Sequence, residues 1–205
     1  LYYGPQYPPY HPVSIVCDPN DAKNVWIARP LHYPNPGVFY SRDQGNTWGK
    51  GQGIDNNFPI ILEIFPSNTS ILFCGCEYEQ DKDMLYKTED GGITWSPVPS
   101  QPFNEQYFHL KDIEVHPFNS DIIFICGESF GTSTSKGIWK TINGGVEWFH
   151  ILQDIDIYDI EISPQNPDEI YAVGVVELCI YLYKSTDAGN TWSIFHTFPI
   201  VYFFP

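Results

Sequence analysis

The sequence predicts an all-β fold made of four repeated units, and three observations lead to this prediction. The stretch SRDQGNTW at 41–48 returns as TEDGGITW at 88–95, TINGGVEW at 141–148 and STDAGNTW at 185–192. The third residues of these stretches lie 47, 53 and 44 residues apart, close to the length of a four-stranded propeller blade. A second, strand-like pattern repeats in step, and no segment has a convincing helical period. We therefore predict a β-propeller of four-stranded antiparallel blades.

Each unit begins with two apolar strands joined by a turn of Pro with Asn, Asp or Ser. These pairs lie in VSIVCDPNDAKNVWIA at 13–28, ILEIFPSNTSILFCG at 61–75, DIEVHPFNSDIIFICG at 112–127 and DIEISPQNPDEIYAVG at 159–174. A third strand such as MLYKT, GIWKT or YLYKS follows. Next comes the eight-residue stretch, here called the turn motif, and then a fourth strand opened by its Trp.

The predicted boundaries follow these repeats. We expect blades at 13–58, 59–106, 107–153 and 154–198, a Tyr/Pro-rich N-terminal segment at 1–12 and an aromatic C-terminal tail at 199–205. An open arc of four blades exposes sheet faces and edges, which is costly. Two arrangements would cover them: the chain is part of a larger propeller, or its aromatic ends cover neighbouring copies or exchange strands with them.

The turn motif has a mechanical explanation. The Asp at its third position accepts hydrogen bonds from the turn, the Ser or Thr at position one adds another, the Gly at position five supplies a positive φ, and the Trp at position eight packs on the hairpin. Asn143 replaces Asp in the third copy and would be a poor catalytic carboxylate, which favours a structural role. The residues assigned to these turns are Ser41, Asp43, Gly45, Trp48, Thr88, Asp90, Gly92, Trp95, Thr141, Asn143, Gly145, Trp148, Ser185, Asp187, Gly189 and Trp192.

The four turn motifs resemble the Asp-box, or bacterial neuraminidase repeat, whose pattern is Ser/Thr-x-Asp-x-Gly-x-Thr-Trp. The resemblance covers about Val13 to Thr197 and implies a propeller with one box per blade. The family includes sialidases, xyloglucan-cleaving glycosidases, sortilin-type receptor domains and photosystem-assembly factors, so the fold does not decide the function.

For two of these activities, the residues that the enzymes need can be compared with those in this sequence. Sialidases hold the substrate carboxylate with three arginines, and Arg29 and Arg42 are the only two here, which argues against that activity. DPNDAKNVWIA followed by GVFYSRDQGNTW resembles the opening blade of the xyloglucan-cleaving enzymes. Those enzymes need two catalytic carboxylates on separate blades, and no motif here identifies the pair.

Three glutamates fall in register when the second pattern is aligned on its proline: Glu63, Glu114 and Glu161. They lie on the strands expected to be innermost, where they could form a channel-facing ligand site, carry acid/base chemistry, or satisfy backbone N–H groups. Asp112, Asp156 and Asp159 add to this acidity, and a metal held by such oxygen ligands would be a hard ion such as calcium. We predict no metal site and no cofactor.

Composition limits the partners. The net charge of −15 disfavours nucleic acid, and no apolar run is long enough for membrane insertion. The five cysteines form no zinc pattern, and free buried thiols are expected. Asn68 begins a possible N-glycosylation triplet, NTS. The remaining possibilities are binding to another protein, self-association through the ends of the chain, and binding to carbohydrate. We expect an extracellular or cell-surface location.

The leading functional prediction is a non-catalytic propeller scaffold or binding module, part of a larger propeller or of a self-assembling extracellular structure. The alternative is a fragment of a xyloglucanase-like glycoside hydrolase that uses paired carboxylates. Enzymatic activity is left open, with the non-catalytic interpretation preferred.

Overall fold

The computed structural model contains four four-stranded antiparallel sheets, which confirms the all-β propeller prediction. It describes residues 14–30, 36–54, 58–77, 83–103, 108–129, 134–177 and 179–199. The predicted N-terminal segment and most of the aromatic tail lie outside the described residues. No helix that could span a membrane occurs in the described ranges.

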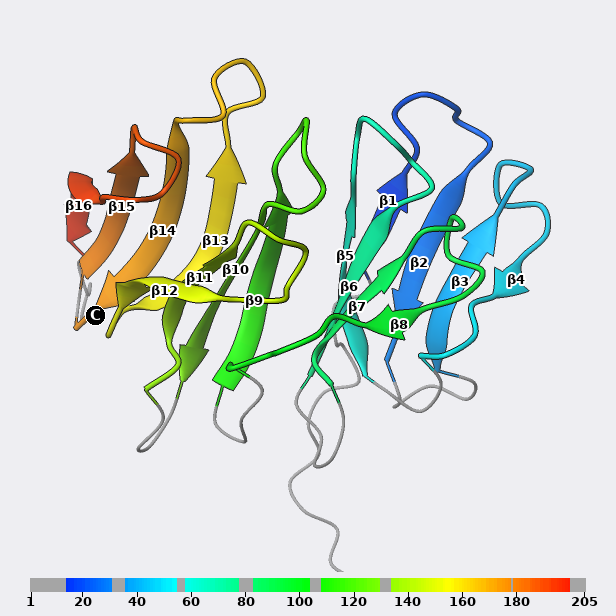
Figure 1. Cartoon of the computed structure of the whole chain (residues 1–205), viewed down its shortest axis with the longest axis horizontal. Coiled ribbons are helices and arrows are strands. Elements are labelled where there is room, and N and C mark those ends of the chain that lie inside the picture. The colour runs from blue at the N-terminus through cyan, green and yellow to red at the C-terminus, as the bar shows by residue number, and fades with distance from the viewer. Residues whose placement is uncertain are drawn as a thin grey trace, which may run out of the picture.

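The chain forms the sheets one after another. Sheet 1 holds β1 (Ile15–Cys17), β2 (Val25–Arg29), β3 (Gly37–Ser41) and β4 (Gly49–Lys50), and sheet 2 holds β5 (Pro59–Ile64), β6 (Leu72–Cys76), β7 (Leu85–Thr88) and β8 (Ser96–Pro97). Sheet 3 holds β9 (Phe108–Val115), β10 (Ile123–Ser129), β11 (Gly137–Thr141) and β12 (Phe149–Gln153), and sheet 4 holds β13 (Asp156–Ile162), β14 (Ile170–Val176), β15 (Cys179–Ser185) and β16 (Ser193–Pro199). Within each sheet, neighbours in sequence are neighbours in space, and the four sheets stand side by side (Figure 1).

Local hydrogen bonds close each turn motif between the third and fourth strands. In sheet 1, Asp43 Oδ1 accepts from the N–H of Thr47 at 2.8 Å and Asp43 Oδ2 accepts from the Thr47 hydroxyl at 2.6 Å. Ser41 Oγ accepts from the N–H of Gly45 at 2.8 Å and donates to Asp43 Oδ1 at 2.8 Å. The glycine at position five has a φ between 83° and 91° in all four copies, a region that other residues rarely adopt.

The tryptophan at position eight differs in burial from copy to copy, which departs from the uniform packing expected of it. Trp95 is 3% exposed, whereas Trp48 is 42% exposed. Its Nε1 donates to the carbonyl of the position-five glycine in the first, second and fourth copies, at 2.9, 3.1 and 3.1 Å. The ring is therefore held by its own turn, and its burial depends on which sheet lies beside it.

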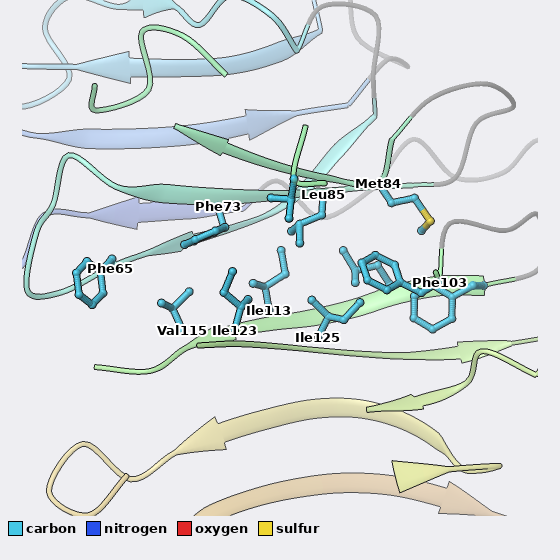
Figure 2. Packing of buried hydrophobic residues seen from close by; sticks show 12 residues of the cluster. Phe65, Phe73, Met84, Leu85, Phe103, Ile113, Val115, Ile123 and Ile125 are labelled. Carbon is cyan, nitrogen blue, oxygen red and sulfur yellow. The ribbon is translucent and has the colours of Figure 1, made fainter. Parts of the chain in front are cut away.

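The core lies between the sheets, because strand side chains alternate between the two faces. One cluster joins sheets 1 and 2, another joins sheets 2 and 3, and a third joins sheets 3 and 4. Figure 2 shows the second cluster, in which Phe73 and Leu85 of sheet 2 face Ile113 and Ile125 of sheet 3. Each sheet therefore needs a neighbour to bury its apolar side chains.

Candidate functional site

Acidic side chains on the first strands of sheets 2, 3 and 4 form the candidate site. Glu63 lies on β5, Glu114 on β9 and Glu161 on β13, each at the same position of its sheet. The strand register pairs them with Phe73, Phe124 and Tyr171 respectively, so each glutamate shares a face with that aromatic residue. Phe73 packs towards sheet 3 and Phe124 towards sheet 4. Glu63 and Glu114 are therefore on the face that their sheet turns towards the next sheet, and Glu161 is at the equivalent position of sheet 4.

Two of the carboxylates accept hydrogen bonds from the adjacent sheet. Asp112 Oδ2 accepts from the N–H of Ile160 at 3.2 Å, and Glu114 Oε1 accepts from the N–H of Ile162 at 3.2 Å. Ser14 plays the same part between sheets 1 and 2, where its Oγ accepts from the N–H of Leu62 at 3.0 Å. These bonds join the inner edges of neighbouring sheets.

Burial and mutual repulsion shift the protonation of this cluster. Desolvation, together with the charges of Glu114, Asp112 and Glu161, raises the pKa of Glu63 to about 9. Desolvation raises the pKa of Glu114 to about 8 and that of Asp112 to about 7, although backbone N–H bonds act in the opposite direction. At neutral pH, Glu63 and Glu114 are therefore mainly protonated, whereas Glu161 is exposed to water.

The remaining acidic candidates lie at the edge of the cluster. Asp159 is exposed on β13 and interacts with the side chain of Asp112. Asp156 Oδ1 accepts from the N–H of Ser129 at 3.3 Å and lies 3.8 Å from Lys136 Nζ. Within the described ranges, no group of three or more His, Cys, Asp or Glu side chains has a geometry that could hold a metal ion.

The turn-motif residues are not brought together with the glutamates, because each motif bonds within its own turn at the connection between strands three and four. Hydrogen bonds from the hydroxyl and N–H of Thr191 and from Ser185 lower the pKa of Asp187 to about 2. The side chain of Asn68 is exposed in the turn after β5, and its Oδ1 accepts from the N–H of Ser70 at 3.2 Å. Neither feature contributes to the cluster of glutamates.

Some residues that connect neighbouring sheets were not selected from the sequence. Lys140 Nζ on β11 donates to the carbonyl of Ala188 in the fourth turn motif at 2.7 Å, and lies 5.5 Å from the centre of the Phe124 ring. The signal was present, because Lys87, Lys140 and Lys184 each stand directly before a turn motif. The partner of Lys140 in the following sheet could be found only from the packing, whereas Lys87 and Lys184 pair with Glu89 and Glu169 of their own sheets.

Comparison with known proteins identifies a family for the chain. The family model described as Sortilin-Vps10, "Sortilin, neurotensin receptor 3", matches residues 37–178, which is more than half of the sequence. The chain belongs to the Sortilin-Vps10 family. Membership in this family agrees with the propeller fold, while the finer likeness of the turn motifs to the Asp-box stays a prediction.

Curated relatives of the chain are enzymes. Xyloglucanase Xgh74A of Acetivibrio thermocellus is 28% identical over 200 residues, which cover 91% of this chain and 20% of the relative. A xyloglucanase of Hypocrea jecorina is 25% identical over 204 residues, covering 93% of this chain and 21% of the relative. The chain thus spans about a fifth of the length of these proteins.

Solved structures agree on the fold. The GH74 enzyme of Niastella koreensis superposes with a TM-score of 0.69 at 17% identity, over 88% of this chain and 28% of the enzyme. At this identity the likeness concerns the fold alone.

The prediction of a non-catalytic scaffold is wrong, since the curated relatives are xyloglucanases and favour the alternative. The preference was based on turn motifs in which every residue has a structural role. Such motifs belong to the framework of a propeller and are compatible with catalysis elsewhere in it.

Proposed function

We propose that the chain is a segment of a xyloglucanase-like glycoside hydrolase, which cleaves glycosidic bonds in a polysaccharide of the xyloglucan type. The observation that carries this proposal is the match of xyloglucanases to about nine-tenths of the chain. Relatives of this kind also support a secreted protein with a carbohydrate partner.

Glycosidic hydrolysis needs a carboxylic acid that is protonated at the working pH and a second carboxyl group that is ionised. The acid protonates the leaving-group oxygen as its bond to the anomeric carbon breaks. Water supplies the hydroxyl group to that carbon, directly or after attack by the second carboxylate, and its remaining proton restores the acid. The acid and its partner should therefore be two carboxyl groups with different pKa values.

We assign the role of acid to Glu63. Burial keeps its carboxyl group protonated at neutral pH, with a pKa of about 9. Asp112 and Glu114, in contrast, are engaged with backbone N–H groups of β13. The exposed Glu161 is the proposed second carboxyl group, and it is close enough to contribute to the raised pKa of Glu63.

The experiment is hydrolysis of xyloglucan by the chain, followed through the release of reducing ends. We expect Glu63→Gln and Glu161→Gln each to lower kcat by about 10²-fold or more, since general acid and base groups contribute roughly that much. Glu89→Gln is the matched control, because Glu89 is 72% exposed and pairs with Lys87 away from the cluster.

Circular dichroism and the melting temperature would show that all three variants are folded. Absence of xyloglucan hydrolysis by the folded, unmodified chain would overturn the proposal that this segment carries the acid and its partner carboxyl group. Hydrolysis that persists in both cluster variants would overturn the assignment of the two glutamates.

A further inference from the structure

A hollow of about 570 Å³ lies between sheets 2 and 3, where their fourth strands form the edge of each sheet. One wall is the segment 100–102, which leaves β8 towards sheet 3 (Figure 1), and the other is the end of the third turn motif with the first residue of β12. Both sheets are packed on each of their faces, so the hollow does not depend on where the sequence begins or ends. Its volume lies within the roughly 300–1,000 Å³ of small-molecule pockets.

The third turn motif departs from the repeat at the residues that border this hollow. Position seven is Thr in the other three copies and Glu147 here, and the residue after the Trp is Gly or Ser in the others and Phe149 here. Both residues line the hollow. Phe149 is 49% exposed, and Glu147 is exposed as well. Since the other three turns close with Thr and a small residue at these positions, the turn itself does not require the two substitutions.

Trp148, which also lines the hollow, is held differently from its counterparts. In the other copies the Trp Nε1 donates to the carbonyl of the position-five glycine, whereas Trp148 Nε1 is buried without a hydrogen-bond partner among the described residues. The ring of Phe103 packs edge-on against the indole, with the ring centres 5.1 Å apart. A buried N–H without a partner is costly, so an acceptor that reached it would be stabilised. No hydrogen bond to Gly145 opposes the small rotation of the ring that would turn this N–H towards the hollow.

These groups select a ligand that carries hydroxyl groups and an apolar face. A hydroxyl group can donate to the Glu147 carboxylate and accept from the Trp148 N–H, whereas a cation satisfies only the carboxylate and an anion only the N–H. The exposed ring of Phe149 supplies a flat apolar surface beside both groups. The net charge of −15 further disfavours an anion. A sugar ring has this combination, because its hydroxyl groups lie around its edge and its C–H groups on its faces.

We propose that the hollow is a second carbohydrate-binding site, which takes a neutral polysaccharide segment with one sugar ring against Phe149 and a hydroxyl group on Glu147. The choice of a xyloglucan-type polysaccharide rests on the proposed function. Glu63 and Glu161 lie on first strands and the hollow borders fourth strands, at the opposite edges of the sheets. A segment bound here therefore lies outside the cluster of glutamates and holds the protein on the polymer without taking part in hydrolysis.

The test is calorimetric titration with xyloglucan oligosaccharides in a Glu63→Gln background, which removes the proposed acid and keeps the probe intact. Phe149→Ser and Glu147→Thr restore residues of the other turn motifs and should fold. We expect each to weaken binding by about tenfold, the order of an aromatic contact or a charge-assisted hydrogen bond. Ile93→Asn is the matched control, because Ile93 is 43% exposed at position six of the second turn motif, where the first and fourth copies have Asn, and it does not line the hollow.

The indole N–H resonance of Trp148, assigned from its loss in Trp148→Phe, reports on the hollow itself and should shift when the oligosaccharide is added. Absence of binding, unchanged affinity in both Phe149→Ser and Glu147→Thr, or an unmoved Trp148 resonance at saturation would overturn the proposal. Tighter binding of trilysine than of the oligosaccharide would overturn it as well and identify a site for cations.

The two proposals fail separately. Binding that depends on Phe149 and Glu147, in a chain that does not hydrolyse xyloglucan, would support the second site and overturn only the proposed activity. Hydrolysis of xyloglucan by a chain whose binding is unaffected by both substitutions would overturn the second site and leave the proposed activity standing.

Discussion

At the residue scale, the third turn motif shows how an amide and a carboxylate can exchange places. In the other three copies a Thr hydroxyl donates to the Asp carboxylate at 2.6 Å. In the third copy Asn143 Nδ2 donates to Glu147 Oε2 at 3.4 Å, while Asn143 Oδ1 still accepts from the N–H of Glu147 at 2.9 Å. The turn therefore requires an acceptor at position three, and the negative charge can move to position seven.

This exchange leads to a prediction for Asp90, whose carboxylate accepts from Thr88, Ile93 and Thr94. Asp90→Ala leaves those donors without a partner and should lower the free energy of unfolding by roughly 1–3 kcal/mol. Asp90→Asn keeps one acceptor oxygen and should lose about half as much. Thermal melts of both variants check this, and equal melting temperatures for the two would contradict it.

A second residue-scale prediction concerns pH. The unfolded chain releases the Glu63 proton near the ordinary glutamate pKa of 4.5, whereas the folded chain keeps it until about pH 9. Between these values the folded state keeps the Glu63 proton, so the contribution of Glu63 to stability is largest below pH 4.5 and falls as pH rises towards about 9. Glu63→Gln should make the decline of melting temperature from about pH 5 to about pH 9 shallower. Glu89→Gln serves as control, and an unchanged slope in Glu63→Gln would contradict the prediction.

At the element scale, the repeat in the sequence was sufficient to predict the four sheets, because Pro-Asn turns and glycines with positive φ are local features. The first-strand glutamates were also found in register, but their environment was not predictable. The pKa of Glu63 depends on Asp112 and Glu114 of a different sheet, and the alignment on the proline says nothing about how closely two sheets approach.

Sheet stacking is tested by Phe73→Ala. Phe73 is fully buried and contributes to the cluster between sheets 2 and 3 (Figure 2). Truncation should lower the free energy of unfolding by about 3–5 kcal/mol, the range for large aromatic residues in cores. Phe118→Ala is the control, since Phe118 is 68% exposed and should change stability by less than about 0.5 kcal/mol. Denaturant titration checks both, and similar losses would argue against this packing.

At the scale of the whole molecule, stability should be unequal across the four sheets. Sheets 2 and 3 are packed on both faces, whereas every residue of β16 in sheet 4 is exposed. Segments with few buried contacts open at a lower free energy than the core.

Hydrogen exchange measures this difference directly. Amides of β10 should exchange slowest and those of β16 fastest among the strands, with β10 limited by global unfolding. Comparison at several denaturant concentrations provides the control, because only globally protected amides depend steeply on denaturant. Equal protection of β10 and β16 would contradict the expected gradient.

Contacts between neighbouring sheets that use main-chain atoms also affect how such a chain can change over generations. Position four of the turn motif holds Gln44, Gly91, Gly144 and Ala188, three residue types with different side chains. Where a cation from the preceding sheet binds at this position, it binds only the carbonyl oxygen, which every amino acid carries. A duplicated or exchanged blade would therefore keep this contact with any position-four residue whose Cβ fits, a condition that fails at Gly91, where a Cβ would overlap Arg42 Nη2.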